Sequence, residues 1–69
     1  MPISARELVR FLKRKGFAEK RQHGSHLILK RFSDGKRAVV PMHSGDVHKT
    51  TLLNILKDTG YTLDELRND

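Results

Sequence analysis

Residues 27–40 read LILKRFSDGKRAVV, in which the turn pair Asp34-Gly35 separates two runs of strand-forming residues. The first run begins with Leu27-Ile28-Leu29, and the second is Arg37-Ala38-Val39-Val40. Asp-Gly tolerates the positive backbone angles of a type I′ turn, so the two runs predict an antiparallel β-hairpin. Pro41 directly after the second run ends that strand or confines it to the edge of a sheet.

Two amphipathic helices flank this hairpin. Ser4 and Glu7 have the spacing of a capping box, and Gly16 supplies a left-handed residue that ends a helix. The prediction is a helix from Ser4 to Lys15, and its apolar stripe for the core consists of Leu8, Phe11 and Leu12.

The second helix follows the hairpin and is stopped by Gly60. Its apolar residues recur at helical spacing and are Leu52, Leu53, Ile55 and Leu56. The start of this helix is open by about one turn. Thr62 and Glu65 then repeat the capping-box spacing, so a short third helix is predicted near the C-terminus.

These elements predict an α+β fold within a single domain of residues 1–69. A short edge strand from Phe17 to Gln22 precedes the hairpin, which makes a three-stranded antiparallel sheet. Two helices covering one face of that sheet would bury the apolar stripes, with the short third helix at the C-terminal end. The uncovered face of the sheet is then the candidate site.

Positive charge is concentrated in the first half of the chain. The sequence has 14 Lys and Arg residues against eight acidic residues, a net charge of +6. Residues 1–37 contain 11 of the basic residues and only three acidic ones, whereas residues 38–69 contain three basic and five acidic residues. Such an excess attracts a polyanion, most commonly nucleic acid, although charge alone also fits a solvated face.

Size and composition exclude several classes of protein. A chain of 69 residues buries a modest core, so a deep substrate cavity is not expected. No cysteine is present for disulfide bonds or a thiolate zinc site. No apolar run approaches the roughly 20 residues that span a bilayer, and no secretion signal precedes the first helix. We therefore expect a cytoplasmic protein that does not contact membranes.

Histidines are the best candidates for chemistry, and they stand at positions 23, 26, 43 and 48. His26 is favoured because it begins a strand after Gly24-Ser25, where a backbone can approach a ligand closely. Imidazole can move a proton to or from a ribose hydroxyl near neutral pH, while neighbouring cations hold the phosphate. The candidate cations are Lys20, Arg21, Lys30 and Arg37.

Other chemistries have weaker support in the sequence. The histidine spacings match no standard metal signature, and no phosphate-binding or dinucleotide glycine pattern occurs, so we expect neither a metal nor a cofactor. Ser25 as a nucleophile would need its hydroxyl to converge with the ring of His26, although adjacent side chains on a strand point to opposite faces.

The chain resembles the HicA family of toxin-antitoxin proteins over almost its whole length. The matching elements are the first helix with Gly16-Phe17, Arg21-Gln22-x-Gly24-Ser25-His26, Asp34-Gly35-Lys36-Arg37, Val40-Pro41-x-His43, and Thr51-Leu52-x-x-Ile55-Leu56-Lys57-x-x-Gly60. One departure is Thr50, where many relatives carry a glycine.

The resemblance implies an α-β-β-β-α fold like that of double-stranded-RNA-binding domains. It also implies a metal-independent endoribonuclease that cleaves mRNA, with His26 as the catalytic residue, and a HicB-like antitoxin as partner. On this basis we expect RNA to contact Lys20, Arg21, Gly24, Ser25, Lys30 and Arg37, and we expect the antitoxin to cover the face that carries His26.

Two other functions stay open at this point. One is a double-stranded-RNA-binding module without catalysis, although His48-Lys49-Thr50-Thr51 carries a single lysine where such modules have several. The other is a protein-interaction module whose basic half docks an acidic partner.

Overall fold

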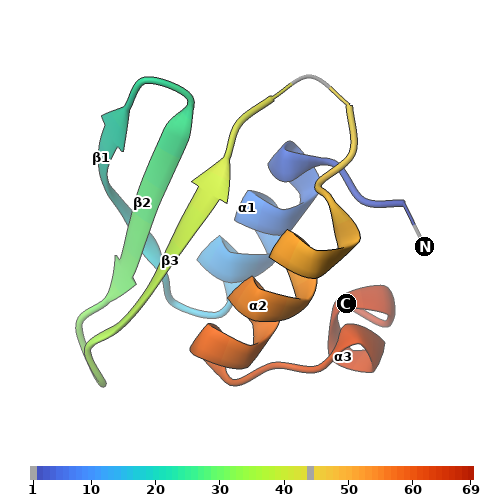
Figure 1. Cartoon of the computed structure of the whole chain (residues 1–69). Helices are drawn as coiled ribbons and strands as arrows, with labels where there is room; N and C mark the ends of the chain where they lie inside the picture. The colour runs from blue at the N-terminus through green and yellow to red at the C-terminus, as the bar shows by residue number, and fades with distance from the viewer. Residues whose placement is uncertain (1, 44) are drawn as a thin grey trace.

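A computed structural model describes residues 2–43 and 45–69 of the chain. Within them the elements are α1 (Ala5–Arg14), β1 (Ala18–His23), β2 (His26–Arg31), β3 (Lys36–Pro41), α2 (Lys49–Thr59) and α3 (Leu63–Arg67). The strands form one antiparallel sheet in the order β1-β2-β3. Figure 1 shows α1 and α2 on the same side of this sheet, with α3 beside them at the C-terminal end. The predicted α+β fold is therefore confirmed: an α-β-β-β-α arrangement plus a short C-terminal helix.

Local capping fixes both ends of α1. The Ser4 hydroxyl accepts a hydrogen bond from the Glu7 N–H at 3.1 Å, and the Glu7 carboxylate accepts one from the Ser4 N–H at 3.3 Å, as the capping-box pattern predicts. At the other end Gly16 takes the left-handed conformation, with φ of 95°. The apolar stripe of this helix is completely buried and comprises Leu8, Phe11 and Leu12.

The sheet has one buried and one open face because side chains alternate along each strand. Leu27 and Leu29 of β2 lie under the helices, as do their cross-strand neighbours Val40 and Ala38 of β3. The intervening residues face the other way, and all six residues of β1 are exposed. We call the uncovered side the open face.

The two hairpin turns differ from the sequence prediction. The type I′ turn at Asp34-Gly35 is wrong, because such a turn needs positive φ at both central residues and only Gly35 has it. Residues 32–35 instead form a four-residue loop, closed by a hydrogen bond of 2.8 Å from the Gly35 N–H to the Arg31 carbonyl. The tight two-residue turn is Gly24-Ser25, between β1 and β2, where Gly24 has φ of 56°.

The start of α2, left open by the sequence, is set by His48. Its Nδ1 accepts a hydrogen bond from the Thr50 N–H at 3.4 Å, so the helix begins at Lys49. Gly60 ends the helix with φ of 85°, and Thr62 begins α3 with the predicted capping box. Leu66 of α3 is buried in the same core.

Arg31 joins the end of β2 to the helices. Its guanidinium donates to the Tyr61 hydroxyl at 2.7 Å and to the Lys15 carbonyl at 2.8 Å, and it forms an ion pair with Asp34 at 2.8 Å. It also lies 4.7 Å from the centre of the Phe17 ring. Arg31 therefore belongs to the structural framework on the helical side of the sheet.

Candidate functional site

His26 is the first residue of β2, and its exposed side chain belongs to the open face. In the sheet it lies directly between His23 of β1 and Pro41 of β3. The next residue, Leu27, is buried under the helices. Because neighbouring strand residues alternate in direction, Leu27 in the core fixes His26 on the opposite side. The imidazole is therefore held by the strand and open to solvent.

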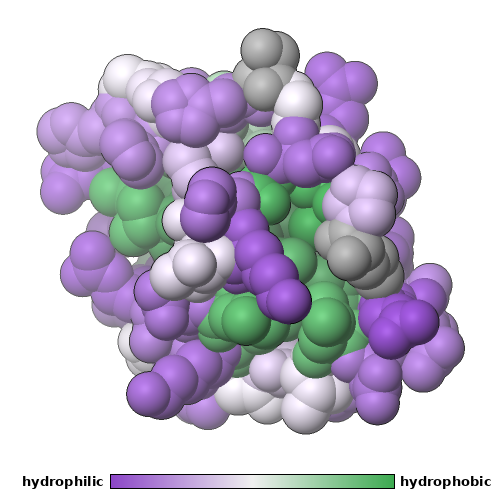
Figure 2. All heavy atoms as spheres, turned by 45° about the vertical axis from the view of Figure 1, so that its right-hand side comes forward, coloured by the Kyte–Doolittle hydropathy of each residue, from purple (hydrophilic) through white to green (hydrophobic). Residues whose placement is uncertain are grey.

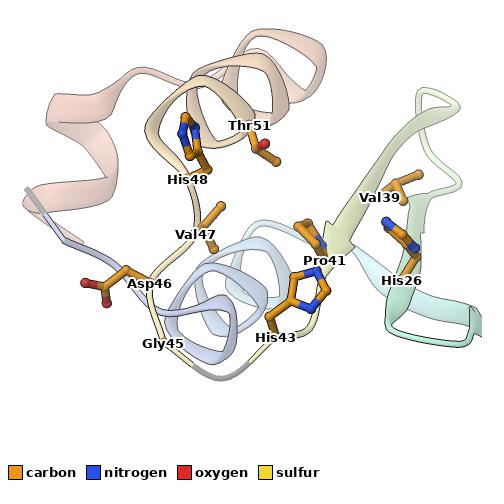
Figure 3. Close-up of a pocket in the computed structure, with 9 residues that line it drawn as sticks. All are labelled: His26, Val39, Pro41, His43, Gly45, Asp46, Val47, His48 and Thr51. Atoms are coloured by element: carbon orange, nitrogen blue, oxygen red, sulfur yellow. The ribbon is translucent and has the colours of Figure 1, made fainter.

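A cleft of about 430 Å³ begins beside His26. It lies between the end of β3 and the beginning of α2, and Figure 3 shows that its residues come from β2, β3, the following segment and α2. Its lining consists of His26, Val39, Pro41, His43, Gly45, Asp46, Val47, His48 and Thr51. We call it the histidine cleft, because three of the four histidines of the chain line it.

Backbone hydrogen bonds hold the walls of the histidine cleft. The Met42 N–H donates to the Ser25 carbonyl at 2.5 Å, so pairing with the first hairpin continues past the end of β3. On the other wall, the Val47 N–H donates to the carbonyl of Ile3 at 2.8 Å, which ties this segment to the start of α1. The cleft is thus built from segments distant in the sequence.

The open face also carries the four predicted RNA-binding cations, Lys20, Arg21, Lys30 and Arg37, which we call the basic patch. They surround Ile28 at a shallow depression of about 70 Å³. A β-bulge between Glu19 and Arg21 adds Lys20 to β1, and such a bulge re-aims side chains, so that two consecutive cations border the same depression.

The arrangement of the basic patch is unfavourable for the protein by itself. Lys30 lies directly opposite Arg37 in the β2–β3 ladder, and like charges in that position repel. Among residues 2–43 and 45–69, no acidic side chain forms an ion pair with any member of the patch. A bound polyanion would relieve this repulsion, which makes the patch a candidate phosphate-binding surface.

Gly24 and Ser25, the other two predicted RNA-binding residues, form the turn directly before His26. The sequence interpretation explained the glycine by close approach to a ligand, but its positive φ already requires a glycine in the turn. No atom lies within 4 Å of the place where a Cβ of Gly24 would stand, so the outer side of the turn is open. The side-chain amide of Gln22 donates a hydrogen bond of 3.0 Å to the Gly24 carbonyl across this turn.

Two features of the open side were missed by sequence reasoning. Phe32, to which the sequence analysis assigned no role, is 73% exposed, and the Lys30 ammonium lies 5.2 Å from the centre of its ring. The position of His43 beside His26 was also missed, although the motif Val40-Pro41-x-His43 had been noted. Strand alternation continued past Pro41 could have predicted the face on which residue 43 lies, but its position beside His26 depends on the register of β2 against β3.

Structural ion pairs perturb the pKa values of Arg31, Asp34 and Asp69. The hydrogen bond from Arg31 lowers the pKa of the Asp34 carboxyl, and the same pairing with Asp34 and Tyr61 raises the pKa of Arg31. Arg14 likewise lowers the pKa of Asp69, with which it pairs. None of these groups lines the histidine cleft.

Two further properties concern metals and membranes. In the described parts of the chain, no three His, Cys, Asp or Glu side chains are placed to hold a metal ion. The helices seen in residues 2–43 and 45–69 are all too short and too polar to cross a membrane.

On the helical side, Figure 2 shows apolar atoms between the charged side chains, and Leu53 of α2 is 43% exposed.

Comparison with known proteins identifies the family of the chain. The model of a family described as the HicA toxin of bacterial toxin-antitoxin systems matches residues 5–61, which include the whole sheet, α1 and α2. No individual curated protein matches the chain. The matched segment contains His26, the basic patch and every residue that lines the histidine cleft. The chain therefore belongs to the HicA toxin family, as the toxin component of a toxin-antitoxin pair with a cognate antitoxin as partner.

Proposed function

We propose that this toxin is an endoribonuclease that cleaves mRNA without a metal ion, with His26 as general acid and base. The observation that carries the proposal is the position of His26, whose exposed ring stands where the open face meets the histidine cleft. The basic patch lies on the same face, about 13 Å along β2 at the position of Lys30. A strand of RNA held by the patch would therefore extend to the imidazole.

The chemistry needs little beyond a proton carrier, because RNA contains its own nucleophile. A base removes the proton of the ribose 2′-hydroxyl, and the oxygen forms a bond to the adjacent phosphorus. The bond from phosphorus to the 5′-oxygen breaks, and that oxygen takes up a proton. The products are a 2′,3′-cyclic phosphate and a 5′-hydroxyl. Proton transfer contributes about 10² to 10⁴-fold to such a reaction, and positioned cations stabilise the developing charge.

The RNA-binding surface in this proposal is the basic patch together with the Gly24-Ser25 turn. Lys20, Arg21, Lys30 and Arg37 would each hold phosphate oxygens through charge-assisted hydrogen bonds. The open space outside Gly24 lets an RNA backbone pass close to the turn that precedes His26. The surface carries few base-reading groups, so the contacts would be mainly to the sugar-phosphate backbone.

The experiment is cleavage of a purified messenger RNA in the presence of EDTA. His26→Ala should abolish cleavage while the circular dichroism spectrum and melting temperature stay close to those of the wild type. His23→Ala is the matched control, because His23 lies directly opposite His26 in the β1–β2 ladder and is also exposed. Undiminished cleavage by His26→Ala would remove this residue from the mechanism.

The antitoxin is proposed to cover the face that carries His26. An acidic surface would complement the basic patch and exclude RNA from it, so one contact would neutralise both binding and catalysis. Electrostatic complementarity of this kind also speeds association, which suits an inhibitor that must act before the toxin does.

The second candidate is a double-stranded-RNA-binding module without catalysis, which the α-β-β-β-α arrangement favours. Such a module reads duplex shape and phosphates. It would leave the messenger RNA uncut in the experiment above, and a separate binding measurement would show tight binding of duplex RNA by both His26→Ala and the wild type.

A further inference from the structure

The proposed reaction requires proton transfer at two places. In a displacement at phosphorus the attacking and leaving oxygens lie roughly in line, on opposite sides of the phosphorus atom. One imidazole fixed on a strand cannot reach both oxygens at once. A second group on the far side of the phosphate would remove this limitation, and the histidine cleft contains candidates.

The three histidines of the cleft differ in what the fold already requires of them. His48 has a structural role, because its Nδ1 accepts the Thr50 N–H and caps α2. His43 is exposed, and among the described residues its ring has no hydrogen-bond or ion-pair partner. Like His26, and unlike His48, His43 is therefore a histidine of the cleft to which the fold gives no structural role.

The sheet register places His43 close to His26. His26 is opposite Pro41, and the hydrogen bond from the Met42 N–H to the Ser25 carbonyl continues the ladder by one residue. His43 therefore occupies the diagonal position two residues beyond Pro41, where Cα atoms are separated by about 7–8 Å in a regular sheet. Figure 3 shows the ring of His43 next to Pro41 and the ring of His26 on the neighbouring strand, with both side chains at the cleft. This spacing leaves room for a phosphate between them.

Pro41 suits the place between the two histidines. The bond at Met42 and Ser25 makes Pro41 and His26 a non-hydrogen-bonded pair, in which backbone N atoms point away from the partner strand. A proline therefore breaks no ladder bond there, and side chains of such pairs approach most closely. Its ring contributes apolar surface to the cleft that both imidazoles line.

We propose that His43 is a second catalytic residue, which exchanges a proton with the RNA on the side of the phosphate opposite His26. One imidazole accepts the proton of the 2′-hydroxyl as the oxygen–phosphorus bond forms. The other, already protonated, gives its proton to the 5′-oxygen as the phosphorus–oxygen bond breaks. The protein ends with the same number of protons, redistributed between the two rings. This inference rests on the proposed function and deepens it.

Other charged groups surround His43 and bear on its pH dependence. Asp46 and His48 line the same cleft, and Arg6 of α1 lines the adjoining depression that His43 borders. With a base and an acid at work, kcat should have a bell-shaped dependence on pH. Removal of His43 should eliminate one limb of that curve in the residual activity.

The first test compares variants on one RNA. His43→Ala should lower kcat by about 10² to 10⁴-fold with little change in KM, because it removes proton transfer rather than binding. His43→Gln keeps a hydrogen-bonding side chain that cannot exchange a proton, so it should be as defective. His23→Asn is the control, because it removes an exposed imidazole that lies opposite His26 but does not line the cleft. It should retain cleavage close to that of the wild type.

The second test uses an RNA in which sulfur replaces the 5′-oxygen of the cleaved linkage. A thiolate needs no proton to leave, because thiols are far more acidic than alcohols. The variant that lacks the general acid should recover most of its rate on this substrate, and the variant that lacks the general base should not. Rescue of one of the two variants, His26→Ala or His43→Ala, is the expected result.

The outcomes separate this inference from the proposed function. If His26→Ala is inactive and both His43 variants cleave at wild-type rates, His43 has no catalytic role and the proposed function stands. An increase in KM alone, with full activity of His43→Gln, would make His43 a binding residue and overturn the inference. If the wild type itself does not cleave RNA, the proposed function fails first.

Discussion

Replacing Arg37 by glutamate should make the protein more stable and at the same time a poorer RNA binder. Arg37 is opposite Lys30 in a pair that the ladder makes non-hydrogen-bonded, so the two charged side chains are at their closest. Arg37→Glu replaces a repulsion with an attraction. The two changes together should raise the free energy of unfolding by about 0.5–1.5 kcal/mol for a cross-strand pair. For a domain of this size that corresponds to an increase in melting temperature of about 2–12 °C.

The assay is thermal unfolding followed by circular dichroism at low salt. Arg37→Gln removes only the repulsion and should give about half of the increase. Most of the gain should vanish near 1 M salt, where the Debye length is about 3 Å. A decrease in melting temperature for Arg37→Glu at low salt would contradict the proposed pairing with Lys30.

The same variants measure RNA binding when they are combined with His26→Ala to prevent cleavage. Loss of a charge-assisted phosphate contact should weaken binding by about tenfold or more, and the slope of log affinity against log salt should fall by about one. Lys57→Glu on α2 makes the same change in net charge away from the sheet, so it should bind nearly as the wild type does. Equal affinity of Arg37→Glu and Lys57→Glu would refute the assignment of RNA to the open face.

Three further predictions concern other parts of the molecule. Phe32→Ala should weaken RNA binding by about fivefold or more, as expected for loss of one stacked base, with no change in melting temperature because the ring is 73% exposed; an unaltered affinity would exclude stacking on Phe32. Arg31 holds the pKa of Asp34 below its ordinary 3.8 in the folded protein, so the folded state binds fewer protons than the unfolded state and stability falls as acid protonates this group. Thermal unfolding from about pH 5 downward should therefore show a smaller acid-induced loss in Asp34→Asn, with a remainder from Asp69, and equal losses in both proteins would contradict this coupling. In the antitoxin complex, an imidazole-modifying reagent should react with His26 more slowly than in the free toxin, whereas an unchanged reaction rate would mean that inhibition does not cover this face.

Much of the fold could be predicted because its signals are local. The capping boxes at Ser4 and Thr62 join residues three apart, and Gly16 and Gly60 end helices through their own backbone conformation. Such interactions form whatever the rest of the chain does. The two runs of strand-forming residues in 27–40 likewise predicted an antiparallel hairpin, which the structure forms.

The turn after β2 was mispredicted because a tertiary contact competes with the local preference. Asp-Gly favours a tight type I′ turn, but Asp34 pairs with Arg31, whose guanidinium is also held by Tyr61 and the Lys15 carbonyl. In the structure these contacts of Arg31 occur together with a four-residue loop between β2 and β3. With Arg31 directed toward the helices, alternation sends Phe32 to the outside, although its hydrophobicity alone predicts burial.

The candidate site was likewise predictable only in part. The amino-acid sequence alone indicated His26 and its cations, since a histidine, a glycine turn and basic residues close together along the chain need no long-range information. Only the tertiary structure brought His26, His43 and His48 to one cleft, and only the register of β2 against β3 set Lys30 opposite Arg37. The physical reason is that strand pairing joins residues as far apart in the sequence as His26 and Pro41, and the hydrogen-bond register that decides which side chains meet is selected by burial of the whole core.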